Sequence, residues 1–422
     1  MPVSRRGVLR LSGAAAIGSS VPALPDAPAE LPPAIVALRP STEGVSPVTS
    51  AERRVRLARA QRLMVESGLD ALAIGPGTSL AYFTGVQWRG DERFFGVLLT
   101  REGEPAWVVP AFEKDRALER VEAGSDVRTW DEHESPYALA AGILRERKVA
   151  TGRLGLEETM PFAFTDGLAR AAPALRADSG TPVAAGCRMF KDAHEIAIMR
   201  RACELSVRAH RALFASLREG MADHEAGRLY AQAASRLGLE RPWALVLFGP
   251  AAALPHGTRQ SRQLRTGDVV LVDAGGSLHG YSSDITRTAV FGAEPTERQR
   301  SIWELVRRAQ DAAFKAARPG AECQAVDAAA RKVIEDGGFG PGYAFFTHRL
   351  GHGIGMDGHE YPYMVKGNTT LLAPGMCFTD EPGIYVRGEL GIRHEDTVVV
   401  TESGCENLAP KWSGTPEEPA VV

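Results

Sequence analysis

Two aspartates in the second half of the chain have the setting of a metal or acid–base site. Asp273 ends an apolar run and is followed by two glycines, and Asp284 lies eleven residues further on. Side chains alternate along a strand, so a hairpin that joins the two segments would bring both carboxylates together. Two buried carboxylates repel each other and become protonated unless a cation lies between them.

Three motifs further along the chain carry the remaining candidate ligands. His352 stands among three glycines in the run GHGIG, Glu381 opens the run EPGIY, and Glu395 lies in the run GIRHED. Glycine lets a backbone approach a ligand closely, and a residue before proline is extended. On the last of these strands Arg393 and Glu395 share a face, whereas His394 points the other way.

The five candidates Asp273, Asp284, His352, Glu381 and Glu395 supply four carboxylates and one imidazole. An oxygen-rich set of this kind favours a hard or borderline divalent metal, such as Mn²⁺, over a thiolate-type zinc site. Four carboxylates also balance the charge of two dications. Two such ions about 3.5–4 Å apart, bridged by a hydroxide, would activate water and receive a tetrahedral oxyanion.

The order Asp, Asp, His, Glu, Glu, together with these three motifs, resembles the pita-bread metallopeptidases and, within them, the proline-specific branch of aminopeptidase P and prolidase. The resemblance is strong over residues 190–410 and looser over 51–180, where the run LAYFTG carries it. It implies a metal-dependent exopeptidase that cleaves the Xaa-Pro bond at peptide N-termini. The implied cofactors are two divalent ions, Mn²⁺ first, with Co²⁺ or Zn²⁺ as alternatives.

The resemblance also implies a role for each ligand. Asp273 would chelate one metal, Asp284 and Glu395 would bridge both, and His352 and Glu381 would complete the two coordination shells.

Further positions match residues of the branch that act on the substrate. His256 matches a substrate histidine, and His359 matches a second histidine that stabilises the tetrahedral intermediate. His348 and Arg393 match other positions that line the substrate site. Glu381 is the candidate for proton transfer. We expect proline-containing peptides as partners and a homodimer as the assembly.

Two other functions fit the same scaffold. One is a lyase of the type that splits dimethylsulfoniopropionate, which carries an additional aspartate two residues after the first; this chain has Gly275 there. The other is a metal-free creatinase-like or binding protein, but such proteins lose the ligands and this chain keeps all five.

Peptide length depends on the cations near the site. A dipeptidase needs a cation for the product-side carboxylate, and arginine binds it best through two parallel hydrogen bonds. Between His359 and Glu381 the only cation is Lys366, although Arg387 or an arginine of the first domain, Arg89 or Arg93, could serve instead. We therefore predict that tripeptides are cleaved better than dipeptides.

The elements that must position these residues divide into two domains. Residues 51–185 alternate helical and strand patterns, which predicts an α/β domain, like the N-terminal domain of creatinase and prolidase. Residues 190–412 combine long helices with strands linked by turns, which predicts an α+β domain; the resemblance makes it the pita-bread catalytic domain. Asp192 and Glu195 have capping-box spacing and predict the helix that opens it.

The N-terminus has the layout of a signal peptide. Arg5 and Arg6 precede a modest apolar stretch at 11–24, as in the twin-arginine export motif. We predict a signal peptide over residues 1–30, a proline-rich linker over 31–50, and export to the periplasm or medium.

Composition excludes several classes of protein. The 422 residues carry a net charge of −3, without the basic excess of a nucleic-acid-binding protein. No apolar run reaches the roughly 20 residues that span a bilayer, so we expect no stable membrane anchor. The five cysteines are scattered and form no C-x-x-C motif, which argues against a disulfide framework.

Overall fold

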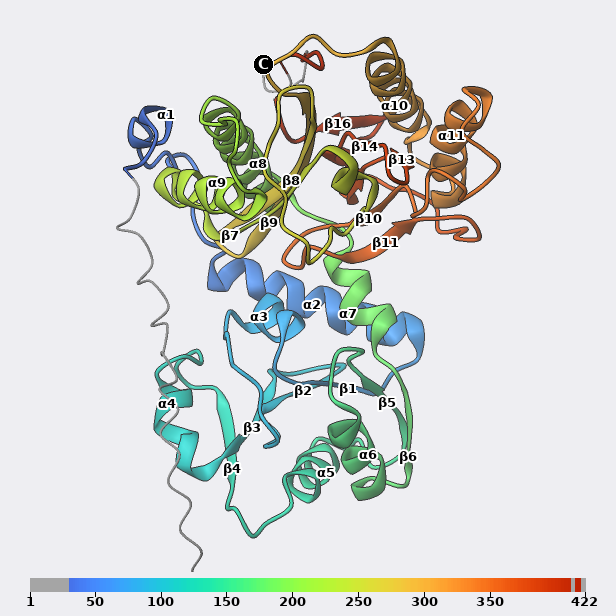
Figure 1. The fold of residues 1–422 in the computed structure, drawn as a ribbon. Helices are drawn as coiled ribbons and strands as arrows, with labels where there is room; N and C mark the ends of the chain where they lie inside the picture. Colours follow the sequence, from blue (N-terminus) through green and yellow to red (C-terminus); the bar gives the residue numbers. More distant parts are fainter. Residues whose placement is uncertain (1–29, 411–413, 419–422) are drawn as a thin grey trace, which may run out of the picture.

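The computed structural model describes residues 30–410 and 414–418, which form an N-terminal α/β domain and a C-terminal α+β domain (Figure 1). This confirms the predicted fold class. The predicted signal peptide, apart from residue 30, lies outside the described residues, as do residues 411 and 412 of the predicted catalytic domain.

The N-terminal domain is a mixed six-stranded sheet with helices on both faces. The strand order is β4-β3-β2-β1-β5-β6, and β1 pairs antiparallel with β2 and parallel with β5. The strands are β1 (Ala71–Ile74), β2 (Gly96–Thr100), β3 (Ala106–Pro110), β4 (Asp126–Trp130), β5 (Gly152–Leu156) and β6 (Leu175–Ser179). The helices are α2 (Ser50–Ser67), α3 (Thr78–Thr84), α4 (Lys114–Leu118), α5 (Pro136–Glu146), α6 (Phe162–Ala171) and α7 (Thr181–Arg188).

Strand β1 is buried on both faces because the sheet lies between two helical layers. Leu72 and Ile74 belong to one apolar cluster, whereas Ala71 and Ala73 belong to the other. This is the alternation expected of a strand, with both faces apolar because both are covered.

The predicted linker at 31–50 packs against the C-terminal domain. It contains the short helix α1 (Pro33–Val36), in which Ile35 is fully buried in the apolar cluster formed by α8 and α9. Further along, the Arg201 guanidinium donates a hydrogen bond of 2.8 Å to the Ser41 hydroxyl. The segment is therefore a packed connection rather than a free tether.

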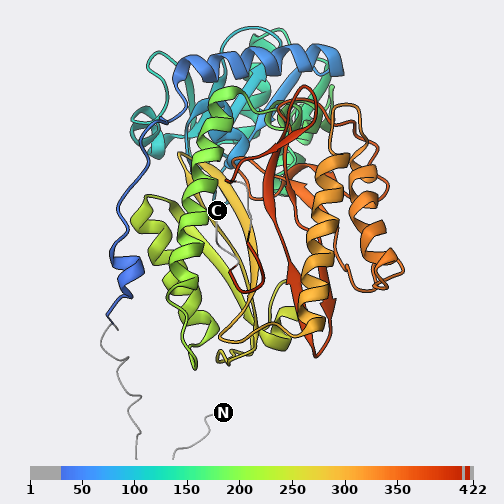
Figure 2. The same ribbon diagram turned by 90° about the horizontal axis from the view of Figure 1, so that it is seen from above.

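The C-terminal domain places two helix pairs outside antiparallel strands (Figure 2). The helices are α8 (Ala193–Phe214), α9 (Asp223–Leu237), α10 (Glu297–Ala316) and α11 (Cys323–Asp336). One sheet has the order β7-β8-β9, a second has the order β11-β10-β12-β15-β16, and β13 pairs with β14. The strands are β7 (Glu240–Phe248), β8 (Val269–Leu278), β9 (Tyr281–Val290), β10 (Gly351–Gly353), β11 (Glu360–Met364), β12 (Cys377–Asp380), β13 (Gly383–Val386), β14 (Leu390–Arg393), β15 (Asp396–Val400) and β16 (Cys405–Asn407).

The two larger sheets are joined at the residues that carry chemistry. An isolated antiparallel bridge pairs Thr286 of β9 with Glu395, which lies between β14 and β15. This bridge brings the Asp273–Asp284 hairpin beside the strands that follow Glu381.

Helix α8 begins with the predicted capping box. The Asp192 carboxylate accepts a hydrogen bond of 2.9 Å from the Glu195 amide, and the Glu195 carboxylate accepts one from the Asp192 amide. Glu195 also forms a 3.1 Å ion pair with Arg56 of α2, so the start of this helix ties the domains together.

The described residues were searched for membrane-spanning helices and for disulfide bonds. No helix among them is long and apolar enough to cross a membrane. All five cysteines are free thiols, four of them buried.

Candidate active site and metal centre

The β8–β9 hairpin places the two aspartates on one face, as their spacing predicts. In the register of this antiparallel pair Asp273 lies opposite Thr286, and Asp284 lies opposite Gly275. Residues two apart on one strand share a face, so the two carboxylates are diagonal neighbours.

The glycines around His352 let three strands approach one another closely. A Cβ atom on Gly351 would lie 1.7 Å from the Thr379 carbonyl oxygen of β12. A Cβ on Gly353 would lie 2.2 Å from the Tyr361 carbonyl oxygen of β11. Only glycine fits at either position, and this packing holds His352 between the two strands.

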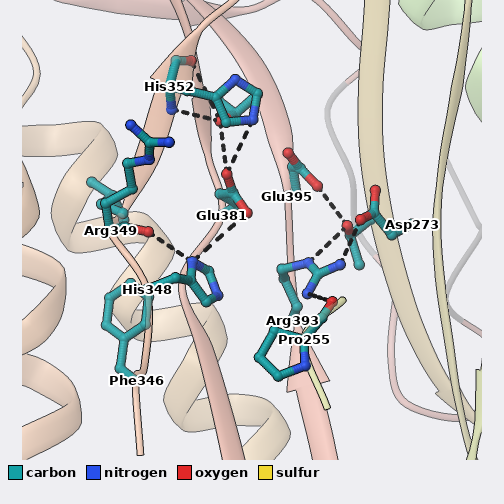
Figure 3. Close-up of polar contacts among 12 residues, drawn as sticks. Pro255, Asp273, Phe346, His348, Arg349, His352, Glu381, Arg393 and Glu395 are labelled. Carbon is teal, nitrogen blue, oxygen red and sulfur yellow. Dashed lines mark hydrogen bonds and ion pairs between the residues drawn. The ribbon is translucent and has the colours of Figure 1, made fainter. Parts of the chain in front are cut away.

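The buried polar groups converge on one point. Ligand atoms of Asp284, His352 and Glu395 lie within 4.8 Å of one another, and all three residues are buried. His352 Nε2 is 3.3 Å from Glu381 Oε1 and 3.9 Å from Asp284 Oδ2. Figure 3 shows Glu381 between His352 and His348.

This donor set requires a cation. One carboxylate oxygen of Asp273 and one of Asp284 are buried without a hydrogen-bond partner. Burial lowers the pKa of His352 to about 3, so the ring is neutral. Its Nδ1 lies 3.2 Å from the Gly353 carbonyl oxygen and donates to it. The other ring nitrogen, Nε2, therefore carries the lone pair and presents it to the carboxyl groups. A lone pair that faces ionised carboxylate oxygens is repulsive unless a proton or a metal ion lies between them, and four carboxylates with one imidazole nitrogen are a donor set that fits a divalent metal.

The pKa shifts of the acids have the same origin. Burial, and then the neighbouring carboxylates, raise the pKa of Asp284 and of Glu395 well above the ordinary range. Burial raises the pKa of Glu381 to about 8. Without metal these groups hold protons, so binding a divalent ion releases protons and strengthens as the pH rises.

Arg393 and the Tyr385 hydroxyl connect Asp273 to His348. The Arg393 guanidinium donates a 2.6 Å hydrogen bond to Asp273 and a 2.9 Å bond to the Tyr385 hydroxyl. Burial lowers the pKa of His348 to about 3, so its ring is neutral, and its Nδ1 donates to the Arg349 carbonyl. The Nε2 of His348 is therefore an acceptor, and the Tyr385 hydroxyl donates to it at 2.7 Å. Sequence reasoning did not identify Tyr385, although it closes the EPGIY motif.

The cluster opens into a cavity of about 430 Å³. His256 and His359 both line it and are exposed to solvent there. The His359 ring stacks on the His352 ring, with centroids 3.6 Å apart and an interplanar angle of 16°. All nine residues predicted for metal or substrate therefore lie at this cavity, listed as Asp273, Asp284, His352, Glu381, Glu395, His256, His348, His359 and Arg393.

The histidine predicted to point away does so. His394 is fully buried, and its Nε2 lies 3.2 Å from the Trp303 carbonyl. His224 also lies outside the site: it is exposed on α9, and its Nδ1 is 3.1 Å from the Ser261 hydroxyl oxygen.

The cavity is also lined by four residues that were not predicted, namely Trp243, Leu245, Pro255 and Arg349. Trp243 lies on β7, and Arg349 lies three residues before His352. Lys366, the cation considered first for binding a product-side carboxylate, does not line the cavity. Lys366 instead precedes Gly367, whose amide donates to Gln324 on α11. Proximity of Arg349 to the GHGIG motif was the signal available in the sequence.

Charged groups from the domain junction hold the segment that carries His359. The carboxylate of the neighbouring Glu360 forms ion pairs with Arg188 at 2.6 Å and with Lys191 at 2.5 Å. The same arginine also pairs with Asp357. The His359 segment is therefore fixed from both sides of the domain junction.

Comparison with known proteins agrees with this geometry. Residues 197–402 match metallopeptidase family M24, and residues 56–190 match the creatinase/prolidase N-terminal domain. The probable dipeptidase PepE of Mycobacterium tuberculosis is 38% identical over 87% of this chain and 96% of its own length. The chain belongs to metallopeptidase family M24. It is a peptidase, and the family implies divalent metal ions at the centre described above.

Two further members of the family are similar along nearly their whole length. The Xaa-Pro dipeptidase of Pyrococcus furiosus is 32% identical over 84% of this chain and 97% of its own. The crystal structure of dipeptidase PepE from Mycobacterium ulcerans superposes with a TM-score of 0.81 at 36% identity, over 87% of this chain and 98% of that one. The two-domain architecture is therefore shared with solved members of the family.

Proposed function

We propose that this metallopeptidase is a Xaa-Pro dipeptidase that uses two divalent ions, with Mn²⁺ as the best. The observation that carries the proposal is the buried group of Asp284, His352 and Glu395, with Glu381 beside His352 and partnerless carboxylate oxygens on two aspartates. The names of the relatives support the substrate class. The sequence led us to expect that tripeptides are cleaved better than dipeptides. We now propose the opposite preference, because the cavity contains a cation that was not considered, Arg349.

The ligand roles follow the predicted division. Asp273 would hold one ion, Asp284 and Glu395 would bridge two, and His352 and Glu381 would complete the shells. When bound, the ions would lower the pKa of a water molecule and polarise the scissile carbonyl.

The chain's own groups do the remaining work. Glu381, whose pKa is raised by burial, accepts the proton that the attacking water loses and passes it to the proline nitrogen as the peptide C–N bond breaks. His359, exposed on the cavity beside His352, donates a hydrogen bond to the oxyanion that develops at the scissile carbonyl. His256 and His348 line the space for the substrate.

The lyase alternative is disfavoured at position 275. A Cβ atom on Gly275 would lie 2.0 Å from the Ser283 carbonyl oxygen, so an aspartate there requires a shift of the hairpin. The metal-free alternative is disfavoured because the chain keeps all five candidate ligands. A homodimer remains part of the proposal.

Chelation is expected to abolish hydrolysis, because the ions supply the activation of water on which the proposed reaction depends. Activity on Xaa-Pro dipeptides should fall to background after chelator treatment, and Mn²⁺ should restore it better than Co²⁺ or Zn²⁺. Metal analysis should find two ions per chain in the active enzyme. Matched Xaa-Ala dipeptides serve as the control for proline specificity.

The proposal fails if activity persists after complete, verified metal removal. Full activity with one ion per chain would contradict the dinuclear centre but leave the metallopeptidase activity intact. Equal cleavage of Xaa-Ala and Xaa-Pro dipeptides would contradict only the proline specificity.

We also propose export through the twin-arginine route, supported by Arg5 and Arg6 ahead of a short apolar stretch. Replacement of both by lysine is expected to keep the activity in the cytoplasmic fraction. The matched control is Arg10→Lys, which changes a neighbouring arginine and should leave export intact. Unchanged periplasmic activity in the Arg5→Lys/Arg6→Lys variant would reject this route.

A further inference from the structure

Two guanidinium groups line the cavity, and only one of them is neutralised by the protein. Arg393 is buried and ion-paired with Asp273 at 2.6 Å. Arg349 is half-buried, and within the described part of the chain no carboxylate lies within 4.0 Å of it. In Figure 3 the two arginines lie on opposite sides of Glu381. The cavity therefore presents one uncompensated cation, on the far side of Glu381 from Asp273.

We infer that Arg349 binds the C-terminal carboxylate of the Xaa-Pro substrate and thereby makes the enzyme prefer dipeptides. This inference rests on the proposed function and adds to it the residue that decides peptide length. In a Xaa-Pro dipeptide the carboxylate is attached to the α-carbon next to the scissile nitrogen. The group that binds it must therefore lie in the cavity that holds the reacting atoms, and Arg349 lines the same cavity as His352 and Glu381.

Electrostatics make such a cation necessary. A substrate carboxylate that enters the cavity loses water, and this loss opposes binding unless a protein cation replaces the water. A planar guanidinium can also offer a carboxylate two parallel hydrogen bonds, which a lysine cannot.

Tyr363 is the positioning residue for this arginine. The Arg349 guanidinium carbon lies 4.4 Å from the centroid of the Tyr363 ring. Tyr363 lies on β11 directly opposite His352 of β10, so the stack is built on the strand pair that carries a metal-ligand candidate. The cation–π contact orients the guanidinium without neutralising its charge, which leaves the charge available to a substrate.

The test compares substrates with and without the carboxylate on the manganese-loaded full chain. The substrates are a Xaa-Pro dipeptide, the matching Xaa-prolinamide and a Xaa-Pro-Yaa tripeptide. Arg349→Met is expected to raise KM and to lower kcat/KM for the dipeptide by about 10- to 100-fold, the effect of losing a hydrogen-bonded charge pair. The amide, which lacks the charge, should change by less than about threefold, with metal content unaltered.

Three further variants separate charge, geometry and position. Arg349→Lys should recover part of the dipeptide activity, because it restores the charge without the planar pair of donors. Tyr363→Leu should reduce the ratio of dipeptide to amide cleavage less than Arg349→Met does. Lys366→Met is the matched control, a cation outside the cavity, and should leave that ratio unchanged.

Each contrary result has a distinct meaning. Equal losses on the dipeptide and the amide in Arg349→Met would show a structural role and overturn the inference while leaving the Xaa-Pro proposal intact. A selective loss of dipeptide activity in Lys366→Met would overturn it in favour of that lysine. A wild-type enzyme that cleaves no Xaa-Pro substrate would overturn the proposed function and this inference together.

Discussion

Asp284→Ala is expected to abolish both metal binding and hydrolysis. Asp284 is buried in the group with His352 and Glu395 and has a carboxylate oxygen without a protein partner, which supports the proposal that it holds metal. We expect kcat to fall by at least about 1,000-fold, since loss of a bridging ligand removes the centre that activates water. Metal analysis and turnover of a Xaa-Pro dipeptide measure the two effects.

The matched variant Asp284→Asn separates metal binding from folding. Burial and neighbouring carboxylates raise the pKa of Asp284, so the metal-free protein gains nothing from its negative charge. The metal-free Asn variant should therefore unfold at the wild-type temperature or above it. Wild-type enzyme should be stabilised by added Mn²⁺, whereas the variant should not, because only a bound ion shifts the folding equilibrium. A variant that keeps two ions and full activity would contradict the bridging role.

His359→Ala is expected to have the second-largest effect and to act on kcat with the metal retained. His359 is exposed on the cavity and is absent from the buried group of ligands. Removal of one donor to a developing oxyanion costs roughly 100- to 1,000-fold in kcat. Turnover and metal content, measured on the same preparation, test this division of roles.

The stacking of His359 on His352 calls for a second variant. His359→Phe keeps an aromatic ring over His352 but has no hydrogen-bond donor. It should be as slow as His359→Ala; activity near wild type would mean that His359 only orients the metal-ligand candidate. His224→Ala, an exposed histidine on α9, is the matched control and should stay within about twofold of wild type. Metal loss as complete as in Asp284→Ala would reject the proposed role of His359.

Local sequence patterns determined which side chains face the site. Strand alternation and a hairpin were enough to place Asp273 and Asp284 on one face, and the register confirms it. The same alternation separated Arg393 and Glu395 from His394, which packs against Trp303. These inferences succeed because the side-chain period of a strand depends only on the backbone.

Contacts between distant segments were decided by the tertiary structure alone. Arg393 reaches Asp273 across 120 residues, and Glu360 is held by Arg188 and Lys191 of the preceding domain boundary. Arg349 enters the cavity because Tyr363, on the neighbouring strand, offers an aromatic face for its guanidinium. The sequence alone does not show this contact, because Arg349 and Tyr363 meet only through the pairing of β10 with β11. Periodicity sets the face on which a side chain lies, but strand order and register, which depend on packing of the whole domain, decide what it meets there.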